Sequence, residues 1–169
     1  WLGTTALDDA ASHQTRGVLA VYVHPDFETD NGTSVNDLAL LLLDQPVTTI
    51  APLGLLGNPG DLPVGEAVRV AGWGISEVGV VDPTNDLQRA GAEVISNASA
   101  AMTFGSVIEP VHLAAKDPAE IACPCVGDSG GPLVATISGT DRLVGLVSFG
   151  SLDCDPALPT VYTRVASYL

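Results

Sequence analysis

The residues most able to do chemistry lie in one glycine-rich segment, 123–134, which reads Cys-Pro-Cys-Val-Gly-Asp-Ser-Gly-Gly-Pro-Leu-Val. It places Ser129 in a turn between glycines, where the backbone can approach a ligand closely. Consecutive amides in such a turn can converge on an anion. A serine hydroxyl becomes a nucleophile only when a neighbouring base takes its proton. Because an ordinary glycine-rich β-turn has the same pattern, this chemistry needs support from the rest of the chain.

Asp37 and the three histidines are the other candidates for acid–base chemistry. Asp37 precedes the apolar run 38–43, and this pattern is typical of an aspartate that caps a turn at a strand edge. His13 lies in a polar loop, and His112 follows Pro110. We expect both of these histidines to be solvated side chains rather than ligands. His24 precedes Pro25 at the end of an apolar stretch.

Short apolar stretches between turn residues must position these groups. The segments expected to form strands are 17–24, 37–43, 67–72, 133–137, 142–148 and 161–165. The intervening segments are rich in Gly, Pro, Asn and Asp, and a short helix is expected at 98–104 with Asn97 as its N-cap. Many short strands predict an all-β barrel or sandwich.

The composition excludes several classes of protein. The chain has 169 residues, of which 46% are hydrophobic and 15% charged, so we expect one ordered domain or two small lobes. Twenty acidic and six basic residues give a net charge of −14, which excludes a basic patch for nucleic acid and disfavours an anionic membrane surface. The longest apolar run, 38–43, is far shorter than the roughly 18 residues needed to cross a membrane.

The segment 127–132, Gly-Asp-Ser-Gly-Gly-Pro, resembles the nucleophile signature of trypsin-like (chymotrypsin-fold) serine proteases. Five further segments resemble parts of that family in the same order, and together they cover almost the whole chain: 21–27, 36–41, 70–74, 146–150 and 160–165. The resemblance implies an all-β fold of two antiparallel six-stranded-type β-barrels with the site in the cleft between them. Residues 1–64 would be the remainder of an incomplete first barrel, and residues 65–169 would be the second.

The resemblance also implies roles for individual residues. Ser129 matches the nucleophile, and the amides of Gly127 and Ser129 match the oxyanion hole. Asp37 matches the acid that orients the catalytic histidine, and Ser148 matches a serine that donates a hydrogen bond to that aspartate. Asp128 matches a buried carboxylate that pairs with the N-terminal ammonium freed by proteolytic activation.

Cysteines and pocket residues follow from the same resemblance. Cys125 and Cys154 match a disulfide between the nucleophile loop and the pocket wall, which implies an oxidising compartment and a secreted protein. Cys123 matches the floor of the specificity pocket, where a neutral side chain removes the preference for Arg or Lys; it could also pair elsewhere or be a buried thiol. The residues expected to bind substrate are Cys123, Val126, Ser148, Phe149, Gly150 and Thr160.

The general base has no candidate in the expected place. The family carries it in a Thr-Ala-Ala-His-Cys-like segment well before the aspartate, and the chain has no such motif. His24 has the right order but lies only 13 residues before Asp37, where it matches a peripheral strand end. Two alternatives therefore remain, a fragment of an active protease or a non-catalytic homologue. We expect the fragment, because Leu2-Gly3 resembles the residues that follow the histidine segment.

The functional expectation is a secreted serine endopeptidase that acts on peptide or protein substrates and is a target for protein inhibitors. The chain alone is expected to be inactive, and the alternative is a binding module that uses the same cleft. We expect no cofactor. Asp8 and Asp9 lie near a calcium loop known in some members, but Thr4 stands where a carboxylate would be needed, so no metal is expected.

Overall fold

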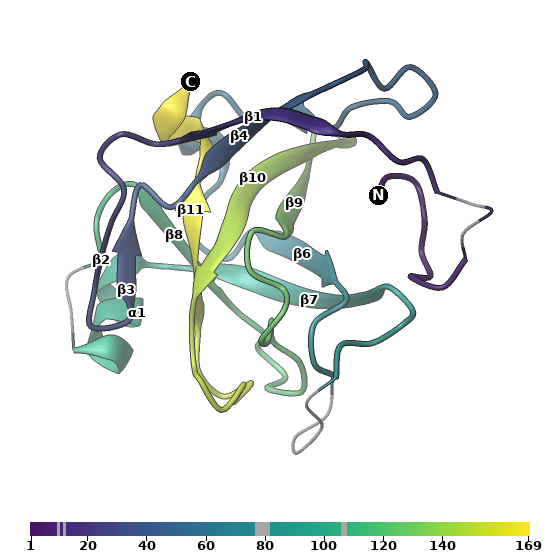
Figure 1. Ribbon diagram of the computed structural model, residues 1–169. Helices are drawn as coiled ribbons and strands as arrows, with labels where there is room; N and C mark the ends of the chain where they lie inside the picture. The colour runs from purple at the N-terminus through teal and green to yellow at the C-terminus, as the bar shows by residue number, and fades with distance from the viewer. Residues whose placement is uncertain (10, 12, 77–81, 106–107) are drawn as a thin grey trace.

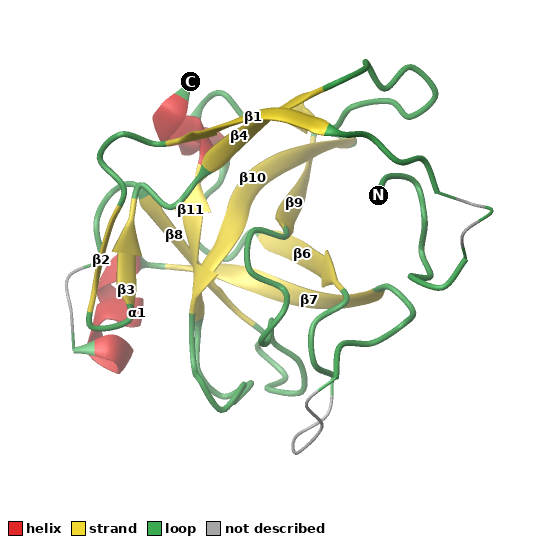
Figure 2. Ribbon diagram, viewed as in Figure 1, coloured by secondary structure: helices red, strands yellow, loops and turns green. Residues whose placement is uncertain are grey.

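The computed structural model describes residues 1–9, 11, 13–76, 82–105 and 108–169. Strands dominate this part of the chain, as Figure 2 shows. The strands are β1 (Val18–Val23), β2 (Glu28–Asp30), β3 (Thr33–Val35), β4 (Ala39–Leu43), β5 (Gly54–Leu55), β6 (Ala67–Gly72), β7 (Gln88–Ile95), β8 (His112–Lys116), β9 (Pro132–Ile137), β10 (Thr140–Phe149) and β11 (Thr160–Arg164). The described ranges also contain one α-helix, α1 (Asn97–Phe104), and two 3₁₀ turns, η1 (Pro59–Asp61) and η2 (Val165–Tyr168).

Strands β6 to β11 close into a six-stranded antiparallel barrel (Figure 1). The order is β11-β8-β7-β6-β9-β10, and β10 pairs with β11 to close the ring. The short strand β5 adds to β10 in the parallel direction. Leu133 and Tyr162 are fully buried at the centre of the core. Leu56 and Leu62, which precede the barrel in sequence, belong to the same core cluster, so the segment that contains η1 packs against the barrel.

The strands before the barrel form two separate antiparallel pairs. β1 pairs with β4, and β2 pairs with β3. Figure 1 shows the β1–β4 ribbon along the top of the view, outside the closed barrel. Its apolar side chains are largely exposed; Leu19 is 68% and Leu40 is 70% accessible. The described residues thus contain one closed barrel, and the division at residues 64 and 65 stays a prediction.

All six segments expected to be strands are strands in the structure, with end shifts of up to two residues. Two barrel strands were missed, β7 and β8. β8 contains the pair Ala114-Ala115, and alanine has a weak strand preference. Burial outweighs this weak preference in β8, because both alanines lie between β7 and β11 and are at most 1% accessible.

Two expectations were wrong. Ser96, not Asn97, caps α1: the Ser96 backbone is extended and its hydroxyl accepts from the Ser99 amide. The Asn97 side chain instead donates to two carbonyls near β8. His112 is not solvated but 1% accessible, because the pairing of β8 with β11 turns its ring into the interior.

His112 connects the N-terminal strands to the barrel. Its Nε2 donates to the carbonyl of Ser34 in β3 at 2.7 Å, and its Nδ1 accepts from the amide of Glu109 at 3.0 Å. These partners require a neutral ring with its proton on Nε2. The ring also meets Phe149 edge-on at 5.6 Å. Among the described residues, no helix is both long and apolar enough to span a membrane.

Candidate active site

Ser129 stands exposed on a turn that is fastened to β10. The amide of Gly130 donates to the carbonyl of Val147 at 2.8 Å, and the amide of Val147 donates to the carbonyl of Gly131 at 2.9 Å. Gly127 and Gly130 have φ values of 99° and 76°, which favour glycine. The glycines of the sequence motif therefore shape a turn that presents the serine hydroxyl.

Asp37 reaches the same strand from the N-terminal part of the chain. The hydroxyl of Ser148, next to Val147, donates to Asp37 Oδ2 at 2.7 Å. The hydroxyl of Thr163 in β11 donates to the Asp37 carbonyl at 2.8 Å. The structure therefore has the hydrogen bond expected between Ser148 and Asp37. It also brings Asp37 and the turn that carries Ser129 to adjacent residues of β10.

The amides of Gly127 and Ser129 form no hydrogen bond with another described residue. Free backbone donors of this kind can stabilise an oxyanion that develops on a substrate. Gly127 is held against Gly74: a Cβ atom on Gly127 would lie 3.1 Å from the Gly74 Cα. The backbone of Gly74 thus limits what can replace Gly127.

The Asp128 carboxylate is held by two backbone amides. Oδ1 accepts from the Gly74 amide at 2.9 Å, and Oδ2 accepts from the Cys125 amide at 3.0 Å. Hypothetical Cβ atoms on Gly72 and Gly74 would come within 2.0 Å and 2.6 Å of this carboxylate group. Because Gly72 and Gly74 have no side chains, the segment 72–74 leaves the space that the Asp128 carboxylate fills. The sequence expectation for Asp128 was an ammonium partner; here both oxygens accept from the chain's own backbone.

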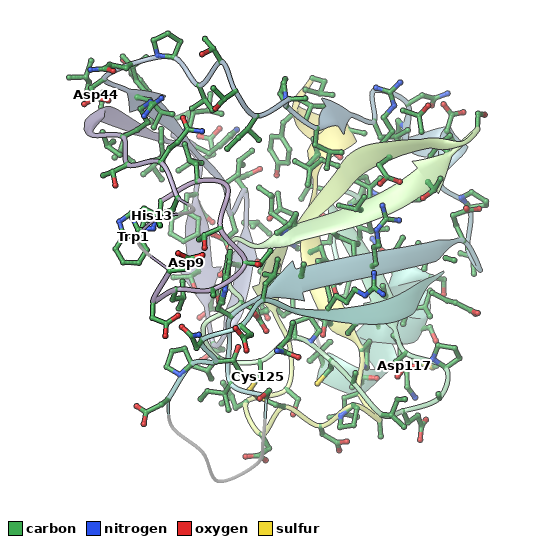
Figure 3. All side chains as sticks on the ribbon, turned by 90° about the vertical axis from the view of Figure 1, so that its right-hand side faces the viewer. Trp1, Asp9, His13, Asp44, Asp117 and Cys125 are labelled. Carbon is green, nitrogen blue, oxygen red and sulfur yellow. A yellow bond between two sulfur atoms is a disulfide. The ribbon has the colours of Figure 1, made fainter. Side chains whose placement is uncertain are left out.

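The three histidines have other partners. His24 Nδ1 accepts from the Asp26 amide at 3.2 Å, and its ring meets Tyr168 edge-on at 5.4 Å. His13 stacks on Trp1 with ring centroids 4.4 Å apart, as Figure 3 shows. His112 is buried with the partners given above. None of these described rings is hydrogen-bonded to Ser129 or Asp37.

Part of the expected specificity pocket is brought together. Cys123, Thr160 and Tyr162 line a small cavity of about 10 Å³, the space of a single water molecule. A Cβ on Gly150 would lie 3.5 Å from the Thr160 hydroxyl. Burial raises the pKa of Tyr162 well above its usual value, although the nearby Thr160 hydroxyl opposes this shift. Ser148, Phe149 and Val126 do not line this cavity; Ser148 and Phe149 lie on β10, and Val126 is 60% accessible.

A larger cleft of about 740 Å³ was not expected from the sequence. It is lined by residues from 70–76, 88–90, 121–128 and 152–156, including Asp128 and all three cysteines. Neither Ser129 nor Asp37 lines it. The sequence contained a signal for this cleft, because Ile121 and Leu152 are apolar residues in loops. In the structure both side chains are more than 80% accessible.

The expected disulfide is present. Cys125 and Cys154 are bonded with their Cα atoms 5.2 Å apart. Cys123 is a half-buried free thiol whose Sγ donates to the Cys154 carbonyl at 3.2 Å. Its pKa is raised, first by burial and then by the charges of Asp155 and Asp128.

The loop that precedes Cys123 is organised by Asp117, which the sequence reasoning missed. Its carboxylate accepts from the amides of Ala119, Ile121 and Ala122 at 2.9 to 3.1 Å. These hydrogen bonds hold the pKa of Asp117 below its ordinary value of 3.8. The dipeptide Asp117-Pro118 is a turn signal that could have indicated this loop. Figure 3 shows Asp117 beside the barrel.

A family model described as Trypsin matches residues 1–169.

Proposed function

The chain belongs to the trypsin family, and from this membership we propose that it is a serine-type endopeptidase domain in which Ser129 attacks the substrate. The observation that carries the proposal is the pairing of Ser148 with Asp37 beside the β10 residue that fastens the Ser129 turn. The substrates are peptides or proteins. The disulfide supports an extracytoplasmic, secreted location, because such bridges persist in oxidising compartments.

The proposed reaction is acyl transfer. Ser129 Oγ bonds to the peptide carbonyl carbon while a base takes its proton, and the amides of Gly127 and Ser129 stabilise the oxyanion. The peptide C–N bond then breaks, the leaving amine takes the proton from the base, and water hydrolyses the ester in a second round. Asp37 orients the base and stabilises its cationic form.

The general base is the missing part of this site. His13, His24 and His112 are each engaged elsewhere, so we do not assign the role to any of them. We propose that the base comes from a segment that is not among these 169 residues, and that the chain alone turns over peptides very slowly.

A second function is a non-catalytic one, and it is favoured by the fact that all three histidines have partners other than Ser129 and Asp37. A domain with a nucleophile turn but no base in reach can serve as a binding module, with the cleft or its loops as the contact surface. This alternative predicts no covalent chemistry at Ser129 in any form of the protein.

A fluorophosphonate probe tests the proposal, because it labels a serine only in an assembled catalytic site. An extended version of the protein that includes a Thr-Ala-Ala-His-Cys-like segment should be labelled at Ser129, and its Ser129→Ala variant should not. The 169-residue chain should label far more slowly. Failure of the extended version to label would favour the binding module, and rapid labelling of the 169-residue chain would contradict the missing base.

For the cleaved residue we propose small or medium apolar side chains. The neutral Cys123 offers no charge to a cationic side chain, and the buried Thr160 occupies space beside it, which disfavours a large side chain. A peptide series with the extended version should rank Ala, Val or Leu above Arg and Lys. Cys123→Asp should raise relative cleavage after Arg and Lys. A preference of about tenfold or more for Arg or Lys in the unaltered protein would contradict this specificity.

A further inference from the structure

All three cysteines of the chain line the 740 Å³ cleft, whose lining does not include Ser129 or Asp37. Two of them form the Cys125–Cys154 disulfide, and Cys123 keeps a free thiol. The Cys123 Sγ donates to the backbone carbonyl of Cys154 at 3.2 Å, so the thiol contacts one of the two bridged residues directly. Figure 3 shows Cys125 in the loops beneath the barrel.

We propose that Cys123 exchanges with this disulfide, so that the bridge moves from Cys125–Cys154 to Cys123–Cys154. The Cys123 thiol gives its proton to solvent, and the thiolate sulfur attacks Cys154 Sγ. A new sulfur–sulfur bond forms as the old one breaks, and the electron pair leaves with Cys125 Sγ, which takes up a proton. One disulfide and one thiol are present before and after, so no oxidant is needed.

The attack is directed at Cys154 for two reasons. Cys154 is the residue that the Cys123 thiol already contacts. A bridge from Cys123 to Cys125 would have to close across Pro124 alone, whose φ is fixed by its ring. Disulfides tolerate only a narrow range of Cα and Cβ geometry, so this short loop is the less favourable product.

Exchange would alter the turn that carries Ser129. The backbone of Cys125 both donates to Asp128 Oδ2 and accepts from the Asp128 amide, each at 3.0 Å. The present bridge anchors the chain four residues before Ser129, and the exchanged bridge would anchor it six residues before. Because the exchanged bridge would hold the chain farther from Ser129, the Gly127 amide would become more mobile. This consequence rests on the proposed function, but the exchange itself does not.

Burial and the charges around Cys123 set the rate of the exchange. The titratable groups that face the thiol are Asp128, Asp155 and Tyr162, and its pKa is raised first by burial and then by the charges of Asp155 and Asp128. Because the thiolate is the attacking form, exchange should be slow at neutral pH. Below the thiol pKa, the rate should rise about tenfold per pH unit.

The test uses the 169-residue chain without added thiol. The protein is held at pH 8 or pH 9, quenched in acid, alkylated with N-ethylmaleimide and mapped by mass spectrometry of its peptides. The label should move from Cys123 to Cys125 with a first-order rate that is independent of protein concentration and about tenfold faster at pH 9. A label that stays on Cys123, a label on Cys154, or a rate that rises with concentration would overturn the proposal.

Two variants complete the test. Cys123→Ser should keep the Cys125–Cys154 bridge and show no labelled cysteine at either pH. Cys125→Ser in a glutathione redox buffer should form a Cys123–Cys154 bridge, detected as a linked peptide pair. A folded Cys125→Ser chain that leaves both thiols free would overturn the proposal. If this variant does not fold, the positions of the label in the wild-type chain decide the question. None of these measurements depends on protease activity.

Discussion

At the scale of single residues, the site is organised by carboxylates with fixed partners. Asp37 is held by Ser148 and through its carbonyl by Thr163, and Asp128 is held by two backbone amides. Hydrogen bonds to a charged acceptor typically contribute about 1.5–3 kcal/mol each. The Asp37 contacts join the segment before β4 to β10 and β11, and the Gly74 contact joins the nucleophile turn to the residues after β6, although these residues lie far apart in sequence.

Ser148→Ala should therefore lower the free energy of unfolding by about 1–3 kcal/mol, because it leaves a half-buried carboxylate oxygen without its donor. Urea unfolding followed by circular dichroism measures the change. Ser167→Ala is the control, since Ser167 is exposed in η2, and it should change stability by less than about 0.5 kcal/mol. Equal stabilities for the Ser148 variant and the wild type would show that the bond contributes nothing.

At the scale of elements, loops are shaped by backbone amides that converge on a carboxylate. The 117–122 loop is held by Asp117, and the 125–128 turn is held by Asp128. Glycine is needed at positions 72 and 74, because the Asp128 carboxylate packs directly against the backbone there. The positions of Cys123 and Gly127 thus depend on these two loops rather than on regular strands.

Gly74→Ala tests the packing of the nucleophile turn. A Cβ there would lie 2.6 Å from Asp128 Cγ, so the carboxylate must move and lose the Gly74 amide. We expect a loss of stability of about 1–3 kcal/mol, measured by urea unfolding. Gly57→Ala is the matched control, because a Cβ on Gly57 would meet nothing within 4 Å. Similar losses in both variants would contradict the role given to Asp128.

The Asp117 loop should be sensitive to acid in a defined direction. Its folded pKa lies below 3.8, so the stabilisation is complete above that value and is lost as the pH falls through the lower, folded pKa. In NMR spectra, the amide signals of Ala119, Ile121 and Ala122 should titrate together with a midpoint below pH 3.8. Asp117→Asn should abolish that titration. A midpoint above pH 3.8 would be inconsistent with the three hydrogen bonds.

At the scale of the whole molecule, one closed barrel is joined to strands with much exposed apolar surface. The barrel has no free edge except beside β5, whereas the β1–β4 ribbon has apolar side chains exposed on both strands. Exposed apolar strands with unpaired edges are templates for association with other chains. The net charge of −14 opposes association but cannot cover the ribbon.

The 169-residue chain should therefore self-associate through this ribbon at micromolar concentrations. The double variant Leu19→Lys with Leu40→Lys should shift the chain toward monomer in sedimentation velocity experiments, although it brings the net charge closer to zero. Met102→Lys is the control, because Met102 is 82% accessible on α1 outside the ribbon, and it should leave association unchanged. An equal effect of both changes would indicate a response to charge rather than to the ribbon.

The sequence was sufficient for the all-β class, the six apolar strands, the disulfide and the identity of the motif around Ser129. The class and the strands depend on local patterns, and the Ser129 motif is a run of contiguous residues, all of which a linear reading can detect. The disulfide was implied by the family resemblance. The alanine-rich β8, the burial of His112 and the Ser96 cap depended on which strands lie next to one another. Local preference says little about such neighbours.

The backbone partners of Asp128 and the lining of the cleft came from the tertiary structure alone, whereas the Ser148–Asp37 hydrogen bond was already implied by the family resemblance. Asp128 meets Gly74 across 54 residues, and Ser148 meets Asp37 across 111. The cleft that contains the three cysteines is likewise formed by strand and loop residues from four separate parts of the chain. Spacing in sequence names the reactive side chains, but the closure of the barrel decides which of them touch, because hydrogen bonds and cavities depend on distance in space.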